Sequence, residues 1–174
     1  MKGVKVAALA CAGIAAASCL GGCGLAGKRS EPDGIATTSM AICQILDKLG
    51  IDNVVGIPSA AEDIELPERY KDVRTIGSAM SPDMEILSRI NPETVIVPRS
   101  LEAGLSAQFE SAGIHAQYFD LSDVEGMYGD IDALGEQYGK QTEAAALRAE
   151  YETYVEELRV QSDDPSPVLV LMAY

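Results

Sequence analysis

The chain has 174 residues, with 27 Asp and Glu against 13 Lys and Arg, and its formal net charge is −14 at pH 7. This charge argues against nucleic acid as a partner and against adhesion to anionic lipid, because both of those surfaces are themselves negative. The length is sufficient for one domain with a substantial hydrophobic core.

The N-terminus has the pattern of a lipoprotein signal peptide. An apolar stretch at 6–18 follows two lysines, and it is shorter than the roughly 20 apolar residues that span a bilayer. Leu20-Gly21-Gly22-Cys23 then has the form of a lipobox, in which the cysteine is acylated and becomes the new N-terminus. We predict a signal peptide at 1–22, lipidation of Cys23 by acyl chains such as palmitate, and a flexible tether at 23–33. The mature protein is expected on the extracytoplasmic face of the cell membrane, with an uncleaved anchor helix as the alternative.

Strands and helices are predicted to alternate between residues 34 and 121. Short apolar runs indicate strands at 34–37, 53–57, 72–76, 94–97 and 116–121. Apolar residues at helical spacing indicate helices at 40–49, 82–90 and 101–112. Ser81 is the expected N-cap of the second helix, with Pro82 at its first position, and Cys43 is expected on the buried face of the first helix. This alternation predicts an α/β fold with a Rossmann-like parallel sheet in an N-terminal lobe at 34–121.

The predicted topology also indicates where a ligand would bind. In parallel α/β sheets, ligands bind beyond the carboxyl ends of the strands, so the loops after Ala36, Ile57, Ile76 and Val97 form the candidate binding edge. At the start of the helix that follows the first strand, the side chains of Thr38 and Ser39 and the free N–H groups could receive an anionic group.

The pattern changes after residue 121. Apolar residues recur at helical spacing from Ser122 to about Val160, which predicts one long helix at 122–160 and leaves open a break near Gly139. Residues 161–166 have the composition of a linker, and a new buried strand is predicted at 167–172. We interpret 161–174 as a linker and the start of a second lobe that is truncated in this chain.

The sequence resembles the solute-binding lipoproteins of ABC importers in which one long, rigid helix joins two lobes. The resemblance rests on GSAMSPDMEIL at 77–87 and INPETVIV at 90–97. Further segments are similar more specifically to the haem-binding lipoproteins of Gram-positive haem uptake, the IsdE type. These segments are TTSMA at 37–41, ILDKLG at 45–50, LPERYKDV at 66–73 and VEGM at 124–127.

The resemblance implies a binding function without catalysis. Haem would be the transported ligand, an ABC permease the partner that receives it, and a haem-donor surface protein a further partner upstream. Met80 would be an axial ligand of the haem iron, opposite a histidine of the second lobe that this chain lacks. The remaining candidates to line the haem pocket are Thr38, Ser39, Met40 and Ser81.

Other readings remain open at this level. Core packing is the alternative for Met80 and Met40, and Tyr70 is a second candidate iron ligand because tyrosinate binds ferric haem. His115, the single histidine, is expected in an exposed loop at the opposite end of the sheet. The acidic loop at 62–65 is either a docking point for the permease or simply solvated.

Two alternatives to haem binding follow from the same pattern, and two further functions are disfavoured. A ferric-siderophore or cobalamin binder would have the same fold, and a truncated lobe could be non-functional. An enzyme is not favoured, because the sequence has no Gly-x-Ser-x-Gly elbow, phosphate loop or Gly-x-Gly-x-x-Gly fingerprint. A zinc or manganese carrier is disfavoured by the presence of one histidine.

Overall fold

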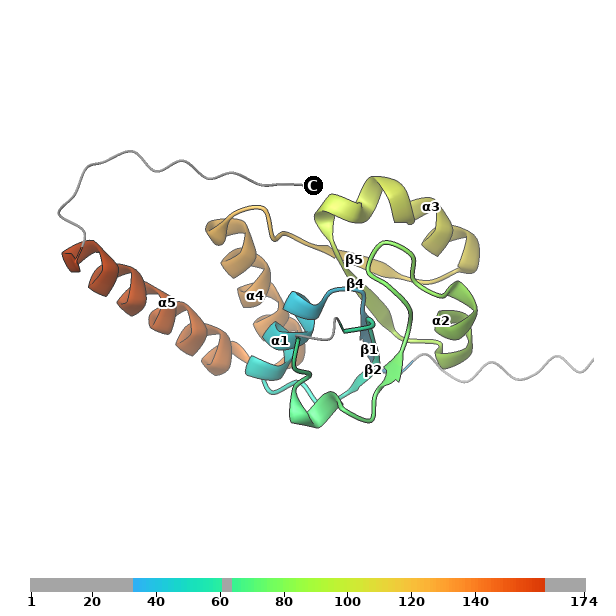
Figure 1. Cartoon of the computed structure of the whole chain (residues 1–174), viewed down its shortest axis with the longest axis horizontal. Coiled ribbons are helices and arrows are strands. Elements are labelled where there is room, and N and C mark those ends of the chain that lie inside the picture. Colours follow the sequence, from blue (N-terminus) through green and yellow to red (C-terminus); the bar gives the residue numbers. More distant parts are fainter. Residues whose placement is uncertain (1–32, 61–63, 162–174) are drawn as a thin grey trace, which may run out of the picture.

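The structure is a computed structural model, and it describes residues 33–60 and 64–161 (Figure 1). The predicted signal peptide, the lipidation site at Cys23 and the strand predicted at 167–172 lie outside these residues. Within the described ranges, no helix combines the length and the apolar character needed to cross a bilayer.

A five-stranded sheet forms the centre of the lobe, with the strand order β3-β2-β1-β4-β5. Every pair of neighbouring strands is parallel, which confirms the predicted sheet. The strands are β1 (Ile35–Thr37), β2 (Val54–Ile57), β3 (Arg74–Thr75), β4 (Thr94–Pro98) and β5 (Ala116–Phe119). Strand β4 is buried along most of its length, as its continuous apolar sequence requires in a sheet that is covered on both faces.

Helices cover both faces of this sheet, and each face has its own hydrophobic core (Figure 1). Successive residues of a strand point to opposite faces, so Ile35 and Ile96 belong to the first core, whereas Ala36 and Val95 belong to the second. The first core lies under α1 (Met40–Lys48) and α4 (Val124–Tyr138), and the second under α2 (Met84–Ile90) and α3 (Glu102–Ala112). Two short 3-10 helices, η1 (Glu68–Tyr70) and η2 (Arg99–Leu101), lie in the connections after β2 and β4.

The stretch predicted as one long helix consists of two. Helix α4 ends at Gly139, whose φ of +68° is a left-handed conformation that glycine adopts without steric cost. Helix α5 (Gln141–Gln161) then turns back along α4, and the ring centroids of Tyr128 and Tyr151 lie 5.2 Å apart. A Cβ on Gly135 would lie 2.9 Å from the Cβ of Ala144, so two small residues permit the close approach at the turn. The sequence left a break near Gly139 open, because helical periodicity continues through the turn, and the structure places the break there.

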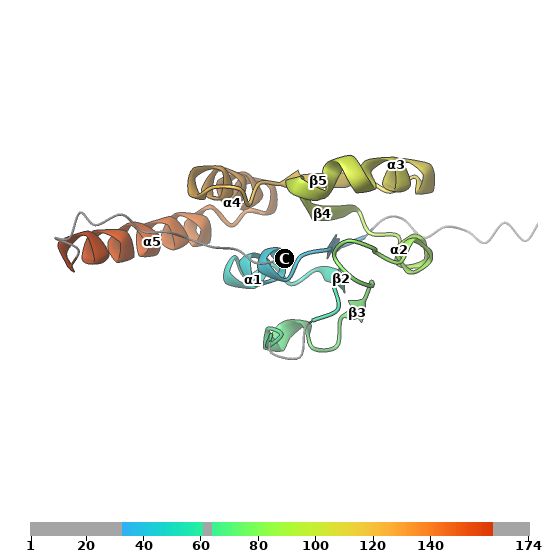
Figure 2. The same ribbon diagram turned by 45° about the horizontal axis from the view of Figure 1, so that its top comes forward.

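The far half of α5 extends away from the sheet, as both views show (Figures 1 and 2). Its first half is held to α4 by Arg148, whose guanidinium donates to the Asp132 carboxylate at 2.8 Å and lies over the Tyr128 ring. Further along α5, Tyr154 and Leu158 are exposed. Helix α5 therefore packs on the lobe through its first half.

Candidate functional site

The carboxyl ends of the five strands meet at one edge of the sheet, and this edge carries the candidate site. Strand β1 lies between β2 and β4, and the chain runs from β1 to β2 but from β4 to β5, so the connections that leave β1 and β4 run in opposite directions and create a topological switch point between them. The segments that follow the strands at this edge are Thr38–Ser39 after β1, Pro58–Ala60 after β2, the loop at 76–83 after β3, and η2 after β4.

Met80 lies at the tip of a closed loop between β3 and α2. The loop is closed at its base by an isolated bridge between Gly77 and Pro82. Within it, the Ser81 N–H donates to the Ser78 carbonyl and to the Ser78 hydroxyl, both at 3.2 Å. The Met80 side chain is 79% exposed. The structure therefore places this thioether in solvent at the predicted edge, and excludes core packing in this conformation.

Main-chain hydrogen bonds attach this loop to the rest of the lobe. The Gly77 carbonyl accepts from Ser59 N–H at 2.8 Å, and the Ile76 carbonyl accepts from Asp83 N–H at 2.7 Å. Gly77 has a φ of +92°, and a Cβ there would lie 3.0 Å from the Ser81 carbonyl oxygen. Glycine is therefore required at this position, both for its conformation and for the close approach of the main chain.

Asp83, rather than the predicted Ser81, caps α2. The Asp83 carboxylate accepts from the N–H groups of Glu85 and Ile86, both at 2.9 Å. The prediction failed because Pro82 is not the first helical residue: it is buried and pairs with Gly77 across the base of the loop. Asp83 consequently has two roles: its side chain caps α2, and its N–H donates to the Ile76 carbonyl at the base of the Met80 loop.

The start of α1 contains the other residues that the sequence proposed. Thr38 is fully buried, and its N–H donates to the Ile96 carbonyl at 3.2 Å. Within the described part of the chain, its hydroxyl has no hydrogen-bond partner. Ser39 and Met40 are half-buried. A ligand at the surface would therefore meet Ser39, Met40 and the free N–H groups of the first turn, while the Thr38 side chain is beneath them.

Ser39 occupies the N-cap position of α1 without capping it through its side chain. Its own N–H donates to the Thr37 hydroxyl at 3.2 Å. The first N–H groups of an α-helix have no partner within the helix and carry the positive end of its dipole. This helix start is consequently suited to receive an anionic group.

A cavity of about 300 Å³ lies at the same edge, at the ends of β4 and β5. Its one cationic side chain is Arg99, whose guanidinium donates to the Tyr118 carbonyl at 3.1 Å. A carboxylate oxygen of Asp120 lies 3.9 Å from Arg99, and hydrogen bonds from Ser122 lower the pKa of that carboxyl. Sequence reasoning missed Arg99, although a basic residue directly after a buried strand at a binding edge was a usable signal. The cavity is lined by Pro98, Arg99, Ser100, Asp120, Leu121 and Ser122.

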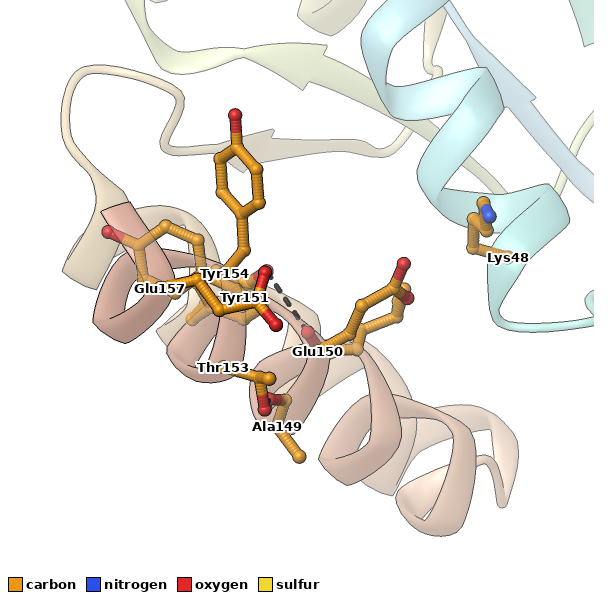
Figure 3. A pocket seen from close by; sticks show the side chains of 9 residues that line it. Lys48, Ala149, Glu150, Tyr151, Thr153, Tyr154 and Glu157 are labelled. Atoms are coloured by element: carbon orange, nitrogen blue, oxygen red, sulfur yellow. Dashed lines mark hydrogen bonds between the residues drawn. The ribbon is translucent and has the colours of Figure 1, made fainter. Parts of the chain in front are cut away.

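A second cavity, of about 710 Å³, lies elsewhere, between α1 and α5 (Figure 3). It is lined by tyrosines of α4 and α5, by acidic residues of α5 and by Lys48. Lys48 is the last residue of α1, and α1 runs antiparallel to the strands, so this wall lies far from the carboxyl edge. The cavity is therefore separate from the loop that presents Met80.

The second candidate iron ligand, Tyr70, is excluded by its position, and His115 lies away from the site. Tyr70 is buried, its hydroxyl donates to the Ile51 carbonyl, and burial raises the pKa of its phenol, so it stays protonated. His115 is exposed just before β5, with Nδ1 3.1 Å from the Thr94 hydroxyl at the start of β4. It lies at the amino edge, as expected. Among the described residues, no group of three or more His, Cys, Asp or Glu side chains could hold a metal ion.

Comparison with known proteins identifies related chains. The family model described as periplasmic binding protein matches residues 35–174. The high-affinity heme uptake system protein IsdE of Staphylococcus aureus is 28% identical over 141 residues, which cover 79% of this chain and 47% of that protein. This chain therefore spans about half the length of that relative.

Solved structures agree with this comparison. An ABC transporter substrate-binding protein from Listeria monocytogenes is similar with a TM-score of 0.72 and 32% identity, over 78% of this chain and 52% of that one. S. aureus IsdE complexed with heme is similar with a TM-score of 0.68 and 25% identity, over 77% of this chain and 52% of that one. The siderophore-binding protein FhuD from Vibrio cholerae has 19% identity and a TM-score of 0.57, and shares the fold.

Proposed function

Because this chain belongs to the periplasmic binding protein family, we propose that it is the N-terminal lobe of an extracytoplasmic binding protein that takes up haem for an ABC importer. One observation carries the proposal. Met80, within the motif that resembles the haem-binding lipoproteins, is 79% exposed at the tip of a loop that main-chain bonds close at the predicted binding edge. A methionine held in this way is available to a ligand without any rearrangement of a core.

The chemistry of Met80 suits haem iron. A thioether is a soft, neutral donor, and haem iron accepts methionine as an axial ligand. Because the loop at 77–82 is closed by main-chain bonds, the position of the sulfur is limited mainly to the rotamers of its own side chain. The proposed role of Met80 is to occupy one axial position of the iron.

The start of α1 is the proposed site for a haem propionate. Strand β2 separates β1 from β3, so the ends of β1 and β3 lie about 10 Å apart across the sheet, and the loops that follow them begin on the same edge. A carboxylate at the α1 N-terminus would be attracted by the helix dipole and by free N–H groups. Ser39 and Met40 are the side chains expected to touch the haem there, because Thr38 is buried beneath them.

The other parts of the proposal concern the whole protein. The opposite axial position of the iron would be filled from outside the described residues, since His115 lies at the amino edge. A permease of an ABC importer is the proposed recipient, and acylation of Cys23 the proposed attachment to the membrane. We propose transport without catalysis.

An optical titration of the purified chain with haem tests the function. We expect a sharp Soret band for the unmodified chain and a shifted, weaker band for Met80→Leu, which removes the sulfur and keeps an apolar side chain. The matched control is Met84→Leu, because Met84 lies four residues away and packs against the second core. Equal spectra for the two variants would exclude Met80 as the ligand, and no specific band for any chain would exclude haem binding by this lobe.

A ferric siderophore is the second candidate ligand. The cavity at the ends of β4 and β5 contains the Arg99 guanidinium and the side chains of Ser100 and Ser122 beside the Asp120 carboxylate, and these hydrogen-bonding groups suit an oxygen-rich ligand. Titration of the chain with a ferric siderophore, monitored by tyrosine fluorescence, distinguishes this function. Loss of siderophore binding in Arg99→Gln, with no effect of Met80→Leu, would favour a siderophore over haem.

A further inference from the structure

The methionines of the described residues differ in their exposure. Met80 is 79% exposed, whereas Met40, Met84 and Met127 are half-buried and pack against the two cores. Oxidation of a thioether requires the oxidant to reach the sulfur, so exposure decides which of these methionines reacts first. Within the described part of the chain, a solvent-borne oxidant therefore meets the Met80 sulfur before the others.

We propose that Met80 is a site of reversible oxidation by hydroperoxides, and that its sulfoxide form switches off the iron-binding edge of this lobe. The regulatory part of this inference rests on the proposed function of Met80 as an iron ligand. The exposed sulfur would thus be both an iron ligand and a target of oxidation, because a sulfur that iron can reach is also reached by an oxidant.

The chemical step is an oxygen transfer. One peroxide oxygen bonds to the Met80 sulfur while the O–O bond breaks, and the other oxygen leaves as water or as an alcohol. The sulfur is oxidised by two electrons and the peroxide is reduced by two. The product is a polar sulfoxide, which methionine sulfoxide reductases convert back to the thioether. The soft donor that haem iron accepts is absent while the sulfoxide persists.

The structure further indicates that oxidation leaves the fold intact. The bonds that close the loop join main-chain groups of Gly77, Ser81 and Asp83 to their neighbours, with added contacts from the side chains of Ser78 and Asp83. The Met80 side chain takes part in none of these contacts. Its oxidation is therefore expected to change ligand binding without changing the thermal stability of the lobe.

The experiment treats the full, ligand-free chain with hydrogen peroxide and follows each methionine by mass spectrometry. Met80 and Met84 fall on one tryptic peptide, Thr75–Arg89, so fragment ions compare the two sulfurs within a single molecule. We expect the Met80 sulfoxide to form several-fold faster than the Met84 sulfoxide. The haem spectrum of the oxidised chain should match that of Met80→Leu, and treatment with methionine sulfoxide reductases should restore it.

The outcomes separate this inference from the proposed function. Equal oxidation rates at Met80 and Met84 would overturn the oxidation site, while haem titration of the untreated chain would still decide the function. Selective oxidation of Met80 with an unchanged haem spectrum would overturn both the switch and the ligand role. In a Met84→Leu chain, peroxide should still weaken haem binding. If it no longer does, the effect of peroxide comes from Met84, and the proposed switch at Met80 is overturned.

Discussion

Replacement of Asp83 by alanine tests the link between the cap of α2 and the loop that presents Met80. The Asp83 carboxylate accepts two main-chain hydrogen bonds of 2.9 Å, from Glu85 and Ile86. Helix α2 has seven residues, so these two bonds are a large share of its main-chain hydrogen bonding. Loss of such an N-cap costs about 1 kcal/mol. Asp83→Ala is therefore expected to destabilise the lobe by that amount.

Urea unfolding followed by circular dichroism measures this effect. A loss of about 1 kcal/mol shifts the midpoint by roughly 0.5 M urea. Asp83→Asn retains an acceptor and is expected to lose much less. The matched control is Glu85→Ala, which removes an exposed ion pair to Arg89 at 2.7 Å and should cost under about 0.5 kcal/mol.

The same variants should also affect the site. Asp83→Ala keeps the N–H that donates to the Ile76 carbonyl, but it uncaps the first turn of α2, which holds that N–H at the base of the Met80 loop. Asp83→Ala is therefore expected to weaken haem binding several-fold, whereas Glu85→Ala should leave it unchanged. Equal urea midpoints for Asp83→Ala and Glu85→Ala would refute the argument that the cap stabilises this helix. A lower midpoint with unchanged haem binding would instead show that the loop holds its shape without the cap.

Three further predictions concern the loop, the neighbouring cavity and the first core. Gly77→Ala should lower both the melting temperature and the affinity for haem, because residue 77 has a φ of +92° and a Cβ there would approach the Ser81 carbonyl to 3.0 Å. Ser122→Ala should raise the pKa of Asp120, measured by NMR, because Ser122 hydrogen bonds lower it. In the unmodified chain, the stability that the ionised Asp120 contributes is fully present above the ordinary carboxyl pKa. It is lost as the pH falls through the lowered pKa of the folded state. Cys43, whose pKa burial raises to about 11, should resist alkylation near pH 8 until urea unfolds the chain, as peptide mapping would show.

The parallel sheet was predictable because its signals are local. Apolar runs such as the one in β4, bounded by turn residues and alternating with amphipathic helices, specify a sheet that is covered on both faces. The cap of α2 was not predictable from local pattern, since Ser81-Pro82 and Asp83 both fit the start of a helix. The pairing of Gly77 with Pro82 decides between them, and that contact exists only in the folded chain.

In the candidate site, too, some features were predictable from the sequence and others depend on contacts of the folded chain. The position of the Met80 loop followed from topology, because loops after parallel strands gather at one edge. The burial of Thr38 did not, since a threonine after a strand can point into the core or toward solvent. Likewise, the sequence did not decide whether the helix breaks near Gly139. The close packing of Gly135 against Ala144 explains why α5 can fold back along α4.

In the Met80 loop, main-chain groups hold the conformation, and the exposed side chain is the group that can react or bind. The main chain of the loop is fixed by its bridge and by its bonds to Ser59, Ile76 and Asp83, while the methionine side chain contributes nothing to the fold. A preorganised loop reduces the conformational entropy that binding must overcome, which favours the proposed role of the exposed sulfur. The same separation explains why substitution or oxidation of Met80 should alter ligand binding alone, whereas changes at Gly77 or Asp83 should alter stability as well.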